Sequence, residues 1–350
     1  MNKQQKFNPV EDKKYFSTFI TGFSLIVGDL LGKHLDRVKI ELLLDGLVIY
    51  STTSSIEKVK KIRFLNNSFL LLRFFDKDKN TPLEKMIKQV LSEKVKLPAR
   101  LPSNWRTFRI ITSQENQLVS VDKQLVANLE ENIRKNFGLK LNRSLPQVEF
   151  WFLSRREGYG FFGMRLTRHQ DYAKSLEKGE LRPELANFLC QISEPNNNDN
   201  FLDPFSGSGA IPIERAQNFP SKHIIASDNN SVAINRLKAR IRFLRLNITV
   251  ENFDALHLDK IVDASIDKIV TDPPWGYFGE KIADLPKFYS NMLDSFYRVL
   301  RKGGIAVLLV GERDSFENLL SKYQAKYTLD KKIYTLVSGK KAGVYKLIKN

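Results

Sequence analysis

Hydrophobic and polar positions in the second half of the chain predict strands and helices in alternation. Short apolar runs typical of buried strands occur at 201–202, 223–227, 248–250, 268–271 and 305–310. Apolar residues at helical spacing separate them at 210–218, 231–246 and 286–300. This alternation with short connections favours a doubly wound parallel sheet, and the runs 331–337 and 344–348 predict a closing antiparallel hairpin.

The first half of the chain predicts two smaller α+β units. In the first, Asp45-Gly46 marks a hairpin, and the other expected elements are strands at 15–20 and 68–75 and helices at 25–35 and 55–65. The second contains an amphipathic helix over 121–137 that Gly138 ends, a helix over 81–95, and strands at 107–113, 148–154 and 159–166. The polar segment 194–200 precedes the parallel sheet. We therefore expect three domains, 1–65, 66–168 and 169–350.

The positive charge of the chain is concentrated in its first half. Its 350 residues carry a formal net charge of +17. Residues 1–170 contain 30 Lys/Arg and 17 Asp/Glu (+13), whereas residues 171–350 contain 26 and 22 (+4). This asymmetry predicts a polyanionic partner that docks mainly on the N-terminal half, with Arg155, Arg156, Arg165 and Arg168 as candidate contacts. A lysine-rich composition of the whole proteome is the alternative explanation.

Cysteine and histidine usage argues against metal and disulfide chemistry. Cys190 is the single cysteine, which excludes an intramolecular disulfide and a cysteine-based zinc site and fits a reducing compartment. The four histidines lack metal-ligand spacing, so we expect no metal site. The polar start of the chain predicts no secretory signal, and the apolar runs are far shorter than the roughly 20 residues of a membrane helix. We expect a soluble, cytoplasmic protein.

Residues 201–210, Phe-Leu-Asp-Pro-Phe-Ser-Gly-Ser-Gly-Ala, form the first chemical motif. A strand that ends in Asp203 enters a turn through Phe205, Gly207, Ser208 and Gly209 before a helix begins. Because glycine lacks a β-carbon and tolerates positive φ, such a turn lets a ligand approach the backbone closely. Pro212 stands where the dinucleotide fingerprint has its third glycine, so a nucleoside is favoured over a pyrophosphate.

Two further acidic residues follow the next strands. Asp228, with Asn229 beside it, comes 19 residues after Gly209, where a carboxylate can accept both hydroxyls of a ribose. Asp254 follows the third strand, and its side chain or the amide of Ala255 can reach an adenine edge. Together with the glycine turn, these residues predict an adenosyl-cofactor site.

The second chemical motif is Asp272-Pro273-Pro274-Trp275, which follows the strand expected at 268–271. Two successive prolines fix the backbone and remove two N–H donors, which leaves carbonyl oxygens as acceptors. The Asp272 carboxylate and the Pro273 carbonyl can hold the hydrogens of an aromatic amine, while Trp275 stacks on the extruded base. The motif predicts methyl transfer to a nucleobase nitrogen.

The two motifs together resemble the amino-methyltransferases that depend on S-adenosylmethionine, whose fourth motif reads Asp/Asn-Pro-Pro-aromatic. More narrowly, residues 179–186 (Gly-Glu-Leu-Arg-Pro-Glu-Leu-Ala) and 211–214 (Ile-Pro-Ile-Glu) look like the THUMP-domain RNA methyltransferases that form N2-methylguanosine, chiefly in tRNA. Trp275 departs from the family, in which Tyr or Phe is commoner at this position. The N-terminal half carries no motif diagnostic of the family.

The resemblance implies a Rossmann-like class I methyltransferase domain preceded by a ferredoxin-like unit over 1–65 and a THUMP-like RNA-binding domain over 66–168. Asp203, Gly207 and Gly209 then line the methionine side of S-adenosylmethionine, Asp228 the ribose, and Asp254 the adenine. It also implies that Arg182 and Pro183 help to close the cofactor pocket. The expected activity is methylation of guanosine N2 in structured RNA, most of all tRNA, by a monomer.

Other functions fit the residues less well. A C5-pyrimidine methyltransferase needs a cysteine near the fourth strand, and Cys190 precedes the first. An NAD-dependent oxidoreductase is disfavoured by the missing third glycine. N6-adenine methylation of RNA or DNA, and an RNA-binding scaffold that has lost turnover, stay open as alternatives.

Overall fold

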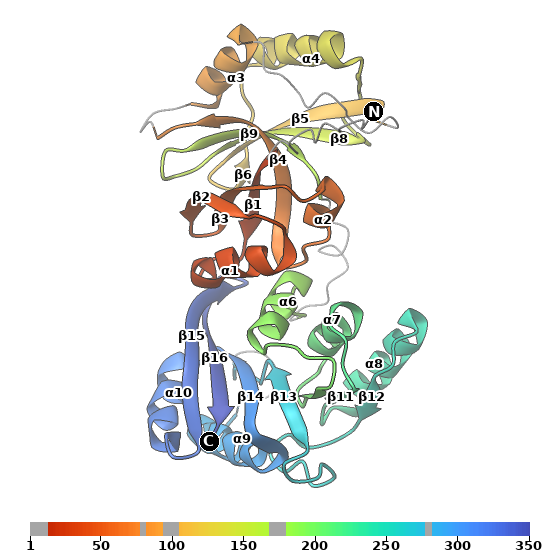
Figure 1. Ribbon diagram of the computed structural model, residues 1–350, viewed down its shortest axis with the longest axis vertical. Coiled ribbons are helices and arrows are strands. Elements are labelled where there is room, and N and C mark those ends of the chain that lie inside the picture. Colours follow the sequence, from red (N-terminus) through yellow and green to blue (C-terminus); the bar gives the residue numbers. More distant parts are fainter. Residues whose placement is uncertain (1–12, 78–81, 94–104, 168–179, 277–281) are drawn as a thin grey trace, which may run out of the picture. The chain divides into compact units, whose positions relative to one another are not determined.

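The computed structural model describes residues 13–77, 82–93, 105–167, 180–276 and 282–350 (Figure 1). The chain divides into two compact units, and both are discontinuous in sequence. The first comprises Met1–Thr18, Leu31–Ile62 and Asn67–His169. The second comprises Phe19–Leu30, Arg63–Asn66 and Gln170–Asn350. Two short segments of the N-terminal half therefore belong to the compact unit that contains both chemical motifs.

The strands of the first unit form one continuous sheet with the order β2-β3-β1-β4-β9-β8-β5-β6, and β7 pairs with β5. Their bounds are β1 (Lys13–Phe19), β2 (Lys39–Leu44), β3 (Leu47–Thr52), β4 (Leu65–Phe75), β5 (Thr107–Gln114), β6 (Gln117–Leu118), β7 (Lys140–Leu141), β8 (Val148–Ser154) and β9 (Gly160–Arg165). β4 lies between β1 and β9, so pairing is unbroken between the regions 1–65 and 66–168. The domain boundary expected at 65/66 stays a prediction.

The helices of the N-terminal half follow local sequence signals closely, with one exception. They are α1 (Ser24–His34), α2 (Ile56–Lys60), α3 (Leu83–Ser92) and α4 (Lys123–Phe137). α4 was expected from its period: the Asp122 side chain caps its start and Gly138, at φ 64°, ends it. The helix predicted over 55–65 was too long, because α2 ends at Lys60 and β4 begins at Leu65.

The four arginines named as candidate RNA contacts differ in their surroundings. Arg165 is buried, pairs with Glu149 at 3.0 Å and lies over the Trp151 ring, so its choice as a surface contact was wrong. Arg155 is largely covered and donates to the Asp45 carbonyl oxygen. Arg156 is exposed, and Arg168 lies outside the described residues. Burial beside a carboxylate, which the sequence pattern does not reveal, separates these residues.

The second unit contains a mostly parallel sheet with the order β12-β11-β10-β13-β14-β16-β15 (Figure 1). The strands are β10 (Asn200–Asp203), β11 (His223–Ser227), β12 (Thr249–Glu251), β13 (Ile266–Thr271), β14 (Leu300–Val310), β15 (Tyr327–Val337) and β16 (Lys340–Lys349). The five strands β10, β11, β12, β13 and β14 run parallel, whereas β16 is antiparallel to both β14 and β15. The expected parallel sheet with a C-terminal antiparallel hairpin is confirmed.

Helices cover both faces of this sheet. They are α6 (Pro183–Ile192), α7 (Ala210–Asn218), α8 (Ser231–Leu244), α9 (Leu285–Val299) and α10 (Arg313–Leu320), followed by a 3₁₀ turn at Ser321–Tyr323. α9 and α10 pack on Leu202 and Ile269, whereas α7 and α8 pack on Ala226 of the opposite face. In the described part of the chain, every helix is too short or too polar to cross a bilayer.

The two N-terminal segments in the second unit are attached by both apolar and polar contacts. Phe23 stacks on Phe188 of α6, with ring centroids 4.3 Å apart, and Phe64 lies 5.2 Å from the same ring. Arg63 donates two hydrogen bonds of 2.7 Å to the carboxylate of Glu214 on α7. The Glu214 side chain is only 3 % exposed and Arg63 is 35 % exposed, so the carboxylate of this pair is shielded and the guanidinium is partly open to solvent.

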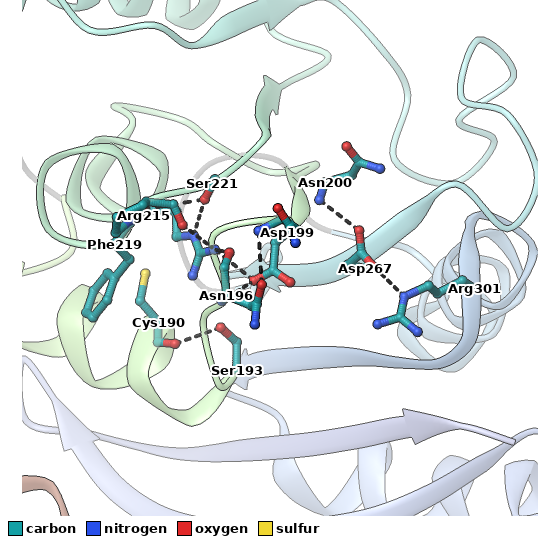
Figure 2. A network of polar contacts seen from close by, with 12 residues as sticks. Cys190, Ser193, Asn196, Asp199, Asn200, Arg215, Phe219, Ser221, Asp267 and Arg301 are labelled. Atoms are coloured by element: carbon teal, nitrogen blue, oxygen red, sulfur yellow. Dashed lines mark hydrogen bonds and ion pairs between the residues drawn. The ribbon is translucent and has the colours of Figure 1, made fainter. Parts of the chain in front are cut away.

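A buried ion pair anchors the last turn of α7 to the segment before β10 (Figure 2). Arg215 donates to the Asp199 carboxylate at 2.8 Å, to the Ser221 hydroxyl at 2.7 Å and to the Asn196 carbonyl at 3.1 Å. Its guanidinium also lies 5.4 Å from the centroid of the Phe201 ring. Since the Arg215 side chain is fully buried, its charge depends on Asp199 for compensation.

Removing one partner of this pair should destabilise the second unit strongly. Arg215→Met leaves the Asp199 carboxylate buried without its cation, which costs about 3–5 kcal/mol in free energy of unfolding. The double variant Arg215→Met/Asp199→Leu should recover most of that loss, because no isolated charge remains. Urea unfolding measures both, with Asp294→Asn in a half-exposed pair as the control, expected to cost under about 1 kcal/mol. An Arg215→Met loss as small as the control's would contradict this role.

Candidate active site

The residues expected from both motifs meet at the carboxyl ends of three adjacent parallel strands. β10 pairs with β11 on one side and with β13 on the other, both in parallel. The strands that follow β10 are thus added first on one side of it and then on the other. Asp203 ends β10, Asp228 follows β11 directly and Asp272 follows β13 directly. In an open α/β sheet, ligands bind outside the carboxyl ends of the strands at such a switch point.

The two glycines of the first motif have different structural tasks. Gly209 has φ 87°, and a β-carbon there would lie 2.2 Å from Cδ1 of Leu237, so glycine lets the turn pack on α8. Gly207 has φ 47°, and no heavy atom lies within 4 Å of the position of its missing β-carbon. The backbone at Gly207 is therefore open to a ligand, as a cofactor loop requires.

Asp228 holds this turn from the neighbouring strand. Its Oδ2 accepts the backbone N–H of Gly207 at 2.9 Å, and its Oδ1 accepts that of Asn230 at 2.9 Å. Asn230 in turn caps α8, whereas Asn229 is exposed. The carboxylate that we expect to bind the ribose is thus hydrogen-bonded to the open glycine turn, and its oxygens keep lone pairs that can accept hydroxyl groups.

Asp203 is buried and bonded to β13 rather than open to solvent. Its Oδ1 accepts the Thr271 hydroxyl at 2.6 Å and the Phe205 N–H at 3.3 Å. Burial raises the pKa of the Asp203 carboxyl to about 8, and the charges of Asp228 and Asp272 push it in the same direction. Thr271, which the sequence analysis did not single out, connects the two motifs through this bond.

Asp254 and Ala255 form a turn after β12. The Asp254 carboxylate accepts the backbone N–H of Leu256 and pairs with Nδ1 of His257, both at 2.9 Å. Asp254 is exposed, whereas Ala255 is buried. The carboxylate thus shapes the turn itself, and its expected part in binding adenine stays a prediction.

Asp272 lies in a partly buried position with a raised pKa. Its Oδ1 accepts the indole N–H of Trp275 at 2.7 Å. Burial raises the pKa of the Asp272 carboxyl to about 7, although the hydrogen bond from Trp275 acts in the opposite direction. Pro273 is buried and Pro274 exposed. A carboxyl group with this pKa changes its charge near neutral pH and is then a strong acceptor for amine hydrogens.

Several contacts at the site lay beyond the reach of the sequence pattern. Arg240 of α8 donates to the Ser208 carbonyl oxygen at 3.1 Å and pairs with Glu180. Arg182 occupies the N-cap position of α6 without a side-chain capping bond and donates to Glu184 at 3.1 Å, while Gly179 lies outside the described residues. Beside the second motif, a cleft of about 470 Å³ is lined by Gly311, Glu312, Arg313, Asp314, Lys340 and Lys341.

Comparison with known proteins points to one class. Residues 170–337 match a family model described as UPF0020: RMKL-like, methyltransferase domain. A tRNA (guanine(6)-N(2))-methyltransferase THUMP3 of Mus musculus is 32% identical over 183 residues, which are 48% of this chain and 36% of that protein. A tRNA (guanine(6)-N2)-methyltransferase of Thermus thermophilus is 26% identical over 215 residues, which are 58% of this chain and 62% of that protein.

The fold agrees with a solved structure over nearly the whole chain. TrmN from Thermus thermophilus superimposes with a TM-score of 0.75 at 22% identity, covering 96% of this chain and 99% of that one. The chain matches little more than a third of the length of the mouse relative. These matches agree with the class expected from the motifs, because the chain is similar to methyltransferases, among them some of the THUMP type. Residues 170–337 are thus similar to methyltransferase domains of the RMKL-like UPF0020 family.

Alanine substitutions should separate the tasks of the two glycines. Gly209→Ala creates a clash with Leu237 as well as backbone strain, so we expect a loss of about 3 kcal/mol in free energy of unfolding. Gly207→Ala meets no atom and should lose about 1 kcal/mol, but its methyl group should weaken S-adenosylhomocysteine binding about tenfold or more. Urea unfolding and calorimetric titration test this. Equal stability of the two variants would argue against the packing role of Gly209.

Proposed function

We propose that this protein is an RNA methyltransferase that transfers a methyl group from S-adenosylmethionine to the exocyclic N2 of guanosine in structured RNA, most of all tRNA. The observation that carries the proposal is the placement of Asp272-Pro273-Pro274-Trp275 beside the glycine turn at the switch point. The names of the relatives, which act on guanine N2 of tRNA or of U6 snRNA, support the choice of atom and substrate.

The residues present fit the adenosyl cofactor. The open backbone at Gly207, with Phe205, Ser208 and Gly209, forms the turn over its methionine end, and Asp228 stands where it can accept ribose hydroxyls. Asn229, Asp254 and Ala255 lie at the loops expected to border the adenosine. When bound, the cofactor supplies an electrophilic methyl group on a cationic sulfur.

The second motif acts on the amine that receives the methyl group. The lone pair of a guanine N2 is delocalised into the ring, and the nitrogen becomes nucleophilic when acceptors hold its hydrogens and draw it towards a tetrahedral geometry. We expect the Asp272 carboxylate and the Pro273 carbonyl to act as those acceptors, and Asp272 can take up the proton that the amine loses. Trp275 borders the space for an extruded base.

The N-terminal half would bind the RNA. Its formal charge of +13 against +4 for the rest supports phosphate contacts there, and Arg156 is an exposed candidate. We further propose a ferredoxin-like unit over 1–65, a THUMP-like domain over 66–168 and the catalytic domain over 169–350. A monomer in the cytoplasm completes the proposal.

Replacing Asp272 should abolish methyl transfer without loss of the cofactor. Asp272→Asn keeps the size of the side chain but lacks a carboxylate to hold the amine and receive its proton, so the rate should fall about 100-fold or more. S-adenosylhomocysteine affinity measured by calorimetry should stay within about threefold of wild type. Asp228→Ala is the matched contrast, because it should weaken that affinity about tenfold or more. Full activity of Asp272→Asn on tRNA would rule out the proposed role.

Discrimination between the cofactor and its product should depend on pH. The carboxyl groups of Asp203 and Asp272, with pKa values of about 8 and about 7, become charged as pH rises from 6 to 9. Negative charge favours the sulfonium cation over the neutral thioether, so the preference for S-adenosylmethionine should rise about tenfold over this range. Calorimetric titration of both ligands measures it. Asp272→Asn should flatten the rise, and a preference independent of pH in wild type would contradict the charge assignment.

The methylated base decides between guanine and the alternative, adenine N6. Nucleoside mass spectrometry after reaction with tRNA should detect N2-methylguanosine. N6-methyladenosine as the product would leave the chemistry of the site intact but exclude the proposed substrate atom. A protein that binds tRNA and S-adenosylhomocysteine yet transfers no methyl group would be the inactive scaffold.

A further inference from the structure

The indole of Trp275 makes one polar contact and one packing contact, and a Phe ring has no donor for the polar one. Its Nε1–H donates to Oδ1 of Asp272 at 2.7 Å. Its ring lies across the backbone of Gly311, because a β-carbon built at Gly311 would lie 2.5–2.7 Å from Cδ2, Cε3 and Cγ of the indole. The side chain is thus held by a polar contact at one place and by close backbone packing at another.

Gly311 is required here by space and not by backbone conformation. It follows β14 directly and is buried, and its φ lies outside the positive range that favours glycine. Any other residue would place a side-chain atom inside the indole. The Trp275 ring therefore packs on the backbone of Gly311, while Asp272 and Trp275 both lie in the segment that follows β13.

The indole contact decides how the Asp272 carboxylate is presented. With Oδ1 engaged, rotation of the carboxylate would break a 2.7 Å hydrogen bond. Among the described residues, Oδ2 accepts no hydrogen bond. One oxygen is thereby fixed to the protein and the other is left to receive a hydrogen of the substrate amine.

We propose that Trp275, seated on Gly311, is a positioning residue that fixes the Asp272 carboxylate through Oδ1 so that Oδ2 meets the target amine. The proposal rests on the function proposed above for the site, and it assigns Trp275 a task distinct from stacking on the base. A phenylalanine would keep the aromatic surface but lose the N–H. The two tasks are therefore separable by a single substitution.

Two titratable groups on two elements respond to the charge of Asp272. Burial and this charge raise the pKa of Asp203 on β10, and both also raise the pKa of Tyr289 on α9. Within the second motif, the Trp275 N–H acts in the opposite direction and lowers the pKa of Asp272. Loss of the indole N–H should consequently raise the pKa of Asp272, so that Asp272 ionises at higher pH.

A pH profile of Trp275→Phe tests this task. If the Asp272 pKa rises by about one unit from about 7, the methyl-transfer rate at saturating tRNA should fall about eightfold at pH 6.5 but by less than about 1.2-fold at pH 9. A base-stacking platform alone predicts a higher KM at every pH with no displacement of the acidic limb. That second result would overturn the proposal.

Nuclear magnetic resonance tests the same contact without any turnover. The chain has three tryptophans, so the indole N–H resonance of Trp275 can be assigned by its loss in Trp275→Phe. In the wild-type protein this resonance should titrate with a midpoint near pH 7, because its acceptor changes charge there. Asp272→Asn should abolish the titration, whereas Asp203→Asn should keep it with a midpoint near pH 7, because the Asp203 carboxyl, with a pKa of about 8, is largely neutral at that pH.

Gly311→Ala completes the test from the other side of the indole. The added methyl group should displace the ring, shift its N–H resonance and remove the titration, and it should move the acidic limb of activity as Trp275→Phe does. Gly32→Ala, at a glycine with open space and ordinary φ, is the control and should change neither. A Trp275 resonance that does not titrate, or that Gly311→Ala leaves unchanged, refutes the proposed positioning role of Trp275. A wild-type protein that titrates as expected but methylates no RNA refutes only the proposed function.

Discussion

The catalytic unit depends on two carboxyl groups at the switch point of the parallel sheet, one buried (Asp203) and one partly buried (Asp272). Asp203 and Asp272 end or follow adjacent strands, and neither is paired with a cation among the described residues. Each instead accepts a neutral donor, the Thr271 hydroxyl for Asp203 and the Trp275 indole for Asp272. Neutral donors stabilise a buried carboxylate less than a cation does, which leaves both groups with raised pKa values and ready to respond to a cationic ligand.

The rest of the unit holds these groups in place from further away. α7 starts at the glycine turn, where Gly209 packs on Leu237, and its last turn carries Arg215 in the buried pair with Asp199. Both ends of the helix are therefore fixed, so the turn over the site has little freedom to shift. Arg63, from the N-terminal half, reinforces the middle of the same helix through Glu214.

Local pattern predicted most of this fold and the location of the site, but it missed contacts that close over long sequence distances. α4 was predictable because Asp122, Gly138 and an amphipathic period mark it. α6 was not predicted, and its polar residues Glu184, Asn187 and Gln191 are buried together with every other residue from Glu184 to Ile192, which a helical period does not reveal. The Trp275–Gly311 contact joins residues 36 positions apart, and nothing local distinguishes Gly311 from a turn glycine. Whether the candidate residues bind as expected stays a prediction.

The raised pKa values of the two carboxyl groups also connect the stability of the folded protein to its function. A carboxyl whose pKa is higher in the folded protein than in the unfolded chain contributes stability that is fully present below the unfolded value, near 4. This contribution is lost as pH rises through about 7 for Asp272 and about 8 for Asp203. In the absence of a cationic ligand, the folded protein is therefore most stable when both carboxyl groups are neutral, while ionisation of Asp272 prepares the site for the amine. A bound sulfonium would offset the cost of that ionisation, so charge on the cofactor and charge on the acceptor favour each other in the same state of the enzyme.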